Sequence, residues 1–245
     1  MPRGGSGPYS SGVSTEPSPS PPPPSSPSPS LTERRKAATQ LDIAHAAAEL
    51  FATRGPDATT AEEIAQRAGI ALRTFYRYFR SKQDAVGPLL TDGADRWRGL
   101  LESTAPGTPL GPALRAAAEQ ALAVPDAQAA EALLRTRGLL RAAGNDPALR
   151  AVWYRVNQES EERLVPVIAS LVGPAEGDAD GPADGPADEG AGRLEVRLVA
   201  AAATDAVRIA METWAGTEAG AEGPGSPADL AARCLERLLG GLDRA

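Results

Sequence analysis

The sequence predicts an all-α protein, and three features of its composition support that prediction. Hydrophobic residues make up 42% of the 245-residue chain, enough for a core, whereas aromatic residues make up only 4%. Alanine and leucine, which favour helices, supply most of the apolar mass. No stretch alternates polar residues with the β-branched and aromatic residues that strands prefer. Proline and glycine instead divide the chain into about nine segments with helical spacing.

Residues 1–30 are almost entirely Gly, Ser and Pro and include the run Pro21–Pro24. Such a segment has too little apolar surface to offset the entropy of ordering, so we expect a disordered tail. A polyproline ligand for another protein is the alternative.

The first ordered segment begins near Thr32 and ends at Gly55-Pro56, with apolar residues at helical spacing in between. Thr60 and Glu63 form a capping box that starts a second, short helix ending near Gly69. A third helix covers residues 72–79.

Ser81 and Asp84 form another capping box and predict a fourth helix that continues to about Glu102. Gly87-Pro88 lies inside this pattern and should kink the helix or delay its start. The later helices are expected at residues 112–124, 127–143, 147–171, 193–215 and 227–242.

These boundaries predict a disordered tail (1–30), a three-helix N-terminal domain (31–80) and a larger helical domain (81–245). Within the larger domain, residues 173–192 are acidic and poor in apolar side chains, and Gly-Pro-Ala-Asp occurs twice in tandem at 181–188. We expect this stretch to be a flexible loop.

The second and third helices form a helix-turn-helix, in which Gly69 allows the sharp turn between them. Ile64, Ala65, Phe75 and Phe79 can bury together. One face of the third helix then presents Leu72, Arg73, Tyr76 and Arg77. A narrow polar and basic face on a short helix suits insertion into the major groove of DNA.

The charge distribution agrees with such a role although the whole chain carries a net charge of −7. Residues 31–84 hold nine Lys or Arg against seven Asp or Glu, and residues 72–82 hold four basic residues and no acidic one. A basic face on an acidic body is compatible with binding to phosphate.

The stretch from Thr74 to Lys82, TFYRYFRSK, resembles the T-x-Y-x-[YH]-F-x-[SN]-K signature of the TetR (tetracycline-repressor) family. Upstream, AAELF at 47–51 followed by Arg54-Gly55 resembles the first helix of that family. The specific resemblance covers residues 31–90. It implies a ligand-responsive transcriptional regulator, acting as a repressor, that binds a palindromic double-stranded DNA operator as a homodimer.

The resemblance also implies roles for individual residues. Thr74, Tyr76 and Lys82 match positions that hold DNA phosphates, and Thr60 opens a helix whose N-terminus favours anions. Leu72, Arg73 and Arg77 take base-facing or backbone-facing positions, with Arg73 expected to read a guanine. Tyr78 either packs or contacts the backbone. Three basic residues that precede the first helix are expected to reach phosphate or the minor groove: Arg34, Arg35 and Lys36.

Three residues depart from the family pattern. Ala71 stands where a serine commonly caps the recognition helix, so that cap is absent. Leu72 replaces a residue that is commonly polar, which leaves a thymine methyl as its base contact. Glu62 stands where many members have Arg. These changes affect which operator is recognised.

In a TetR-like body, bulky apolar residues on several helices would line a cavity for a small, mainly hydrophobic effector, with Arg137, Arg141 and Asn157 as polar anchors. The apolar candidates are Trp97, Leu100, Leu133, Leu140, Trp153, Met211 and Trp214. The last two helices should form the homodimer interface.

An all-helical enzyme and a helical scaffold that does not bind DNA are the rival hypotheses. One histidine (His45), one cysteine (Cys234) and no phosphate-cradling glycine loop leave few catalytic options, so we predict no catalytic site, metal site or cofactor. The most apolar stretch, 194–214, contains five charged residues, which argues against a membrane span. We therefore expect a cytoplasmic protein.

Overall fold

The computed structural model describes residues 30–105, 107–173 and 186–239, and in these ranges it contains nine α-helices, one 3-10 turn and no strand. The predicted all-α class is confirmed. Residues 1–29, to which the expected disordered tail belongs, lie outside the described ranges. In chain order, the elements are α1 (Leu31–Arg54), α2 (Ala61–Arg67), α3 (Leu72–Tyr78), η1 (Asp84–Val86), α4 (Gly87–Glu102), α5 (Leu110–Ala121), α6 (Ala127–Ala143), α7 (Pro147–Val172), α8 (Pro186–Ala215) and α9 (Pro227–Leu239).

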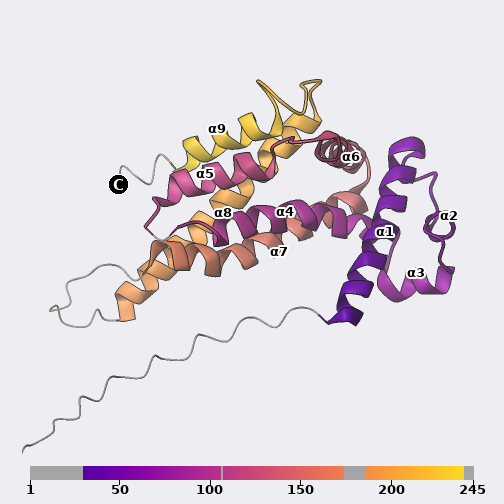
Figure 1. Cartoon of the computed structure of the whole chain (residues 1–245), viewed down its shortest axis with the longest axis horizontal. Coiled ribbons are helices and arrows are strands. Elements are labelled where there is room, and N and C mark those ends of the chain that lie inside the picture. Colours follow the sequence, from indigo (N-terminus) through magenta and orange to yellow (C-terminus); the bar gives the residue numbers. More distant parts are fainter. Residues whose placement is uncertain (1–29, 106, 174–185, 240–245) are drawn as a thin grey trace, which may run out of the picture.

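Helices α1–α3 form one end of the molecule, and α4–α9 extend away from that end as a bundle (Figure 1). Within the bundle, α8 packs against α9 and α7, and α4 packs against α5 and α7. Helix α6 connects the two parts because it packs against both α1 and α7. None of the described helices is long and apolar enough to cross a membrane.

The start of the fourth helix is delayed, as Gly87-Pro88 predicted. Ser81 and Asp84 make the predicted reciprocal contact just before η1, since the Asp84 backbone N–H donates to the Ser81 Oγ at 3.1 Å and the Ser81 hydroxyl donates to the Asp84 carboxylate at 2.8 Å. Helix α4 begins only at Gly87 and carries Pro88 in its first turn. A proline fits there because the first N–H groups of a helix have no intrahelical partner.

The expected loop at 173–192 is wrong in its second half, because α8 begins at Pro186 rather than near residue 193. Proline suits the first helical position, and each residue added to a long existing helix gains a hydrogen bond without a new nucleation cost. The tandem Gly-Pro-Ala-Asp repeat at 181–188 has the composition of a loop, so the sequence did not predict that α8 begins within it. Residues 174–185 lie outside the described ranges.

Two apolar clusters hold the described helices together. The first includes Phe75 of α3 and Phe79, which directly follows α3, together with Leu139 of α6, Trp153 of α7 and Trp214 of α8. The second joins α4, α5, α7, α8 and α9, and Cys234 packs at its edge. The first cluster thus runs across the predicted boundary between residues 80 and 81, which is not marked by a break in packing.

Candidate nucleic-acid interface and ligand cavity

Helix α2 begins with the capping box that the sequence predicted. The Thr60 hydroxyl accepts a bond from the Glu63 backbone N–H at 3.2 Å, and the Thr60 backbone N–H donates to the Glu63 carboxylate at 2.8 Å. The Thr60 hydroxyl also donates to the Glu63 carboxylate at 3.0 Å. The two bonds that the carboxylate accepts, first from the Thr60 backbone and then from its hydroxyl, hold the pKa of Glu63 below its ordinary value. Thr60 is exposed at this helix start.

The turn between α2 and α3 depends on Gly69, whose φ of 68° lies in the left-handed region that glycine adopts without strain. Beside it, the Ile70 backbone N–H donates to the carbonyl of Ala65 at 3.0 Å, which closes the end of α2. Helix α3 follows at once, and Ala71 provides no side-chain cap, as its sequence predicted.

Helix α3 has one buried and one exposed face. Phe75 is fully buried and Phe79 is 6% exposed. On the other face Leu72 is 38% and Tyr76 57% exposed. Arg73 and Arg77 are exposed as well, and Thr74 is half-buried. The structure therefore places Leu72, Arg73, Tyr76 and Arg77 together on the free face, as the helical spacing predicted.

The arginines of this face differ in their partners. In the part of the chain that the structure describes, Arg73 makes no ion pair or side-chain hydrogen bond. The guanidinium of Arg77 lies over the ring of Tyr78, 5.1 Å from its centroid. Tyr78 itself is half-buried against the first apolar cluster. Packing is therefore one role of Tyr78, and a contact with the DNA backbone stays a prediction.

Lys82 lies beside α3 and joins two segments of the chain. Its ammonium donates to the carbonyl of Pro56 at 2.7 Å and to that of Thr59 at 2.8 Å. Thr59 is fully buried and donates its own hydroxyl to the Gly55 carbonyl at 2.9 Å. Lys82 thus fixes the loop before α2, a role that the sequence did not reveal, and a lysine ammonium has one further N–H for another acceptor.

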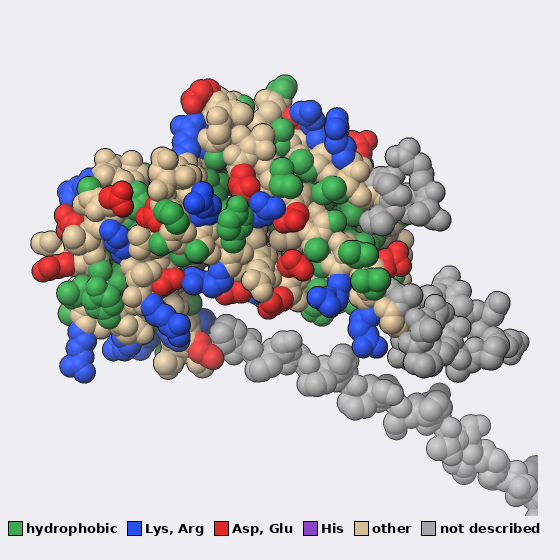
Figure 2. Space-filling view, turned by 180° about the vertical axis from the view of Figure 1, so that it is seen from behind, with side chains coloured by type: hydrophobic (Ala, Val, Ile, Leu, Met, Phe, Trp, Pro, Cys, Tyr) green, Lys and Arg blue, Asp and Glu red, His purple; other side chains and the backbone are tan. Residues whose placement is uncertain are grey.

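The three basic residues near the N-terminal end lie inside α1 rather than before it. A capping box of Ser30 and Glu33 starts α1 at Leu31, so Arg34, Arg35 and Lys36 occupy its first turns. All three are exposed. This box lies at the edge of the Pro/Ser-rich segment, whose composition does not indicate a helix start. In Figure 2 the end formed by α1–α3 lies on the left, and Lys and Arg side chains gather along its lower edge.

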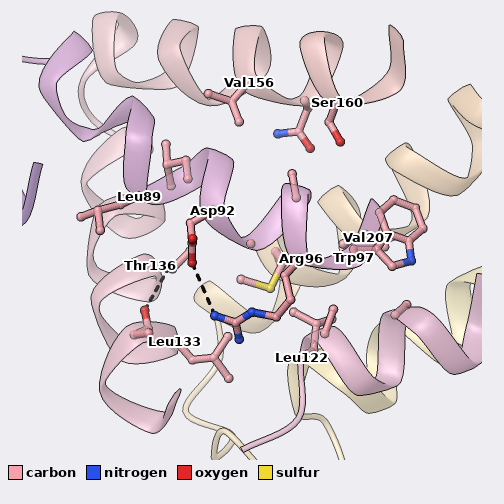
Figure 3. Close-up of a pocket in the computed structure, with 18 of the residues that line it drawn as sticks. Leu89, Asp92, Arg96, Trp97, Leu122, Leu133, Thr136, Val156, Ser160 and Val207 are labelled. Carbon is pink, nitrogen blue, oxygen red and sulfur yellow. Dashed lines mark hydrogen bonds and ion pairs between the residues drawn. The ribbon is translucent and has the colours of Figure 1, made fainter. Parts of the chain in front are cut away.

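A cavity of about 120 Å³ lies within the bundle, lined by residues of α4, α6, α7, α8 and the end of α5. In Figure 3 Trp97 and Leu122 lie on one side of it and Leu89 and Thr136 on the other, while Ser160 extends from α7. Five of the predicted lining residues are among its walls, namely Trp97, Leu133, Trp153, Asn157 and Met211.

The other five predicted lining residues lie elsewhere. Leu100 packs against the second apolar cluster, while Leu140 and Trp214 belong to the first. Arg137 is 9% exposed and donates to the carbonyls of Trp214 (3.3 Å), Ala219 (3.0 Å) and Thr217, with its guanidinium 4.6 Å from the Trp214 ring centroid.

Arg141 has a similar position. It donates to the carbonyls of Ala215 at 2.7 Å and Thr217 at 2.8 Å, and it pairs with Glu218. Both arginines therefore bind the end of α8 and the segment after it. The prediction that Arg137 and Arg141 anchor a ligand is wrong for this cavity, because neither lines it. The carbonyls at a helix C-terminus lack intrahelical partners and attract cations.

Residues 43–86, which run from α1 to the end of η1, match the family model described as bacterial regulatory proteins, tetR family. The N-terminal helix-turn-helix segment of the chain is therefore similar to that of TetR-family regulators. The match includes the whole helix-turn-helix and the stretch 74–82 that carries the signature. The TetR family consists of transcriptional regulators, and the sequence-level resemblance is thereby confirmed.

Two relatives from Mycobacterium tuberculosis H37Rv illustrate the extent of the similarity. The HTH-type transcriptional repressor Rv3405c is 38% identical over 80 residues, which are 31% of this chain and 43% of that protein. The HTH-type transcriptional repressor KstR2 is 43% identical over 63 residues, or 24% of this chain and 32% of that protein. The chain thus matches less than half the length of either relative.

Similarity in fold extends further than similarity in sequence. The structure of Salmonella enterica GusR superposes with a TM-score of 0.51 at 17% identity, covering 84% of this chain and 96% of that one. At this identity the comparison shows a shared fold alone.

Proposed function

We propose that this chain is a sequence-specific DNA-binding transcriptional regulator, a repressor that a small, mainly hydrophobic effector releases from its operator. The observation that supports DNA binding most directly is the free face of α3, where Arg73 is exposed and without an ion pair among the described residues. An arginine in this state retains its donors for a guanine edge.

The groups around α3 suit a role in orienting the helix on DNA. Thr60 is exposed at the start of α2, Tyr76 is exposed beside Arg73, and Arg34 and Lys36 are exposed on the first turns of α1. We assign Thr60, Thr74, Tyr76, Tyr78 and Lys82 to phosphate contacts, which fix orientation, and Leu72, Arg73 and Arg77 to the base-facing side. We likewise assign the division into residues 31–80 for DNA binding and 81–245 for dimerisation and effector binding.

Operator binding is tested by footprinting the chain on genomic DNA and measuring its affinity for the recovered palindrome by fluorescence anisotropy. We expect binding at least about a thousandfold tighter than to random duplex at the same salt concentration. An enzyme or a scaffold without DNA-binding activity is the alternative, and equal affinity for both duplexes would favour it.

We propose that the active form is a homodimer that pairs through α8 and α9. Leu194 and Leu198 of α8 are 60% and 57% exposed, Ile209 43%, and Leu238 of α9 45%. At 3.6 residues per turn the three α8 residues fall on one side of that helix. Exposed apolar residues gathered on one face are typical of an interface with another chain.

A charge placed on this face tests the dimer. Leu238→Glu should disfavour association by several kcal/mol, because two carboxylates related by symmetry would become buried in an apolar contact. Leu134→Glu is the matched control, since Leu134 of α6 is 52% exposed but lies outside α8 and α9. Sedimentation should give monomers for the first variant and dimers for the second. The opposite pattern would place the interface on α6.

We propose that an effector in the cavity lowers operator affinity through α4. This helix follows η1 directly, and η1 follows the Lys82 contact with the loop before α2, while Trp97 of α4 lines the cavity. An effector can shift the equilibrium only by its different affinity for the two states of the protein. Operator affinity and tryptophan fluorescence should therefore be titrated together. Ligands that bind without changing operator affinity would contradict the coupling.

A further inference from the structure

One helix contributes a pair of neutral polar residues to the largely apolar cavity. Asn157 and Ser160 lie three residues apart on α7 and both line the cavity. Ser160 is only 9% exposed, and its hydroxyl has no hydrogen-bond partner among the described residues. Figure 3 shows the Ser160 side chain directed from α7 toward the cavity. A hydroxyl without a protein partner on a cavity wall is free to hydrogen-bond with a ligand or with water.

Asn157 adds further unused capacity to the same wall. Its amide nitrogen donates to the carbonyl of Trp153 at 2.9 Å, and no other side-chain bond of Asn157 occurs in the described part of the chain. One N–H and the amide oxygen are therefore available. Thr204 of α8 also lines the cavity, and its buried hydroxyl lacks a partner there as well. The lining can thus both donate and accept hydrogen bonds.

The charges around the cavity do not favour an ionic ligand. Among the described lining residues the only cation is Arg96, which lies 3.4 Å from the carboxylate of Asp92, the only acidic residue. These two side chains are 49% and 65% exposed, so the pair lies toward solvent. Arg137 and Arg141 are engaged at the end of α8. A charged group brought into the apolar interior would lack a free counterion.

The size of the cavity restricts the ligand further. Its volume of about 120 Å³ is close to that of engineered apolar cavities of ~150 Å³ that bind benzene. Most of the remaining lining residues are apolar and include Leu122, Val207 and Met211. A single ring fits this description, with one oxygen for the polar wall.

We propose that the cavity binds a compact, uncharged molecule of about one ring, whose single hydroxyl or carbonyl oxygen hydrogen-bonds with Ser160 and Asn157. This inference rests on the proposed function, since it specifies the chemical class of the effector. On this proposal the effector is recognised by neutral hydrogen bonds from Ser160 and Asn157, and not by Arg137 or Arg141.

Three single-ring probes separate the possibilities: phenol and toluene, which have nearly the same shape, and benzoate, which carries a somewhat larger charged group. Calorimetry on the full chain without DNA should give the tightest binding for phenol. Toluene should bind about fivefold more weakly, because it leaves the Ser160 hydroxyl unpaired, and benzoate more weakly still. Equal binding of phenol and toluene, tighter binding of benzoate, or no binding of any probe at millimolar concentration would each overturn the proposal.

Two serines of α7 provide matched variants. Ser160→Ala should reduce the preference for phenol over toluene to near unity. Ser170→Ala should retain the preference, because Ser170 is exposed and donates its hydroxyl to the Val167 carbonyl at 2.8 Å. Asn157→Leu, which keeps the side-chain size, should also reduce the preference. Identical behaviour of the two serine variants would overturn the assignment to Ser160.

Operator binding is measured on the same samples without ligand. If operator binding is intact but the phenol preference is absent, this inference fails and the proposed function stands. If the unsubstituted chain binds operator and random duplex equally well, the proposed function fails, regardless of how the three probes bind.

Discussion

The arginines of α3 and those of α6 belong to the same residue type on neighbouring parts of the molecule, yet they serve different ends. Arg73 on α3 is exposed and has no ion pair within the described residues. Arg137 on α6 is buried and donates to three backbone carbonyls. An arginine is available for a ligand only where the fold does not already use its donors.

The difference arises from what lies opposite each helix. The free face of α3 has no packed neighbour, because its other face carries Phe75 into the core. Helix α6 packs against α8, whose C-terminal carbonyls have no intrahelical partner. Those carbonyls hold Arg137 and Arg141. The following predictions test this contrast.

The largest effect is expected for Arg137→Leu. The substitution removes three hydrogen bonds from a buried guanidinium, although the carbonyls of Trp214, Thr217 and Ala219 each keep another donor. The free energy of unfolding should therefore fall by about 2–3 kcal/mol. Arg137→Lys should lose less than Arg137→Leu, because it keeps the charge, although an ammonium cannot reproduce the planar fork. Urea denaturation measures both. If Arg137→Leu leaves stability unchanged but weakens ligand binding, the arginine is an anchor after all.

Arg73→Ala should show the opposite pattern. Stability should stay the same, whereas discrimination at one operator base pair should fall by about 1–3 kcal/mol. Anisotropy with operator variants at each position measures this loss. Arg115→Ala on α5 is a suitable control, since Arg115 is exposed on a helix outside the helix-turn-helix. Equal losses on operator and random duplex would mean that Arg73 contacts only phosphate.

We expect Lys82 both to hold the loop before α2 and to contact a DNA phosphate. Lys82→Met should therefore change both the stability of the fold and the binding of the operator. Loss of the bonds to Pro56 and Thr59 should reduce the free energy of unfolding by about 1–2 kcal/mol. Loss of a phosphate contact should also flatten the slope of log affinity against log salt by about 0.9. Denaturation and a salt titration separate the effects. A changed stability with an unchanged slope would leave Lys82 a positioning residue alone.

The smallest effect concerns the ion pair between Asp84 of η1 and Arg155 of α7, whose atoms lie 2.7 Å apart. Burial raises the pKa of Asp84, but hydrogen bonds from Arg155 and Ser81 outweigh it and hold this pKa below the ordinary 3.8. The carboxylate therefore stabilises the fold above about pH 4, and its contribution is lost as pH falls through the lowered pKa.

Asp84→Asn should accordingly remove roughly 0.5–1 kcal/mol of stability at pH 7, and the loss should shrink as the pH falls below the ordinary pKa of the carboxyl. Thermal unfolding at a series of pH values measures the difference between the two chains. Asp92→Asn serves as the control, because the Asp92 side chain is 65% exposed and pairs only within α4. A difference for Asp84→Asn that persists unchanged into acid would point to packing rather than charge.

The local parts of the fold were predictable from sequence because their causes lie close together in the chain. The capping box at Thr60, the turn at Gly69 and the bounds of α6 (Ala127–Ala143) followed from neighbouring residues. The exposed face of α3 followed from helical spacing. Where a boundary was missed, as at Pro186, a low-complexity composition concealed a real helix.

The residues of the cavity were predictable only in part, because burial and partners depend on distant segments. Arg137 and the carbonyl of Ala219 are 82 positions apart, so nothing in the sequence around α6 indicates their bond. Ser160 resembles a solvated serine among the charged residues of 159–163. Only the packing of α4 and α8 against α7 makes it a buried polar group facing a cavity.

The first apolar cluster has a consequence for how the molecule opens. Since Phe75 of α3 shares this cluster with Leu139 of α6 and Trp153 of α7, the helix-turn-helix has no closed core of its own. Amide hydrogens of α3 should therefore exchange with solvent at rates similar to those of α6, through one cooperative opening. A fragment that ends after α4 would expose that shared surface and should be recovered as a collapsed, protease-sensitive chain rather than as a separate folded domain.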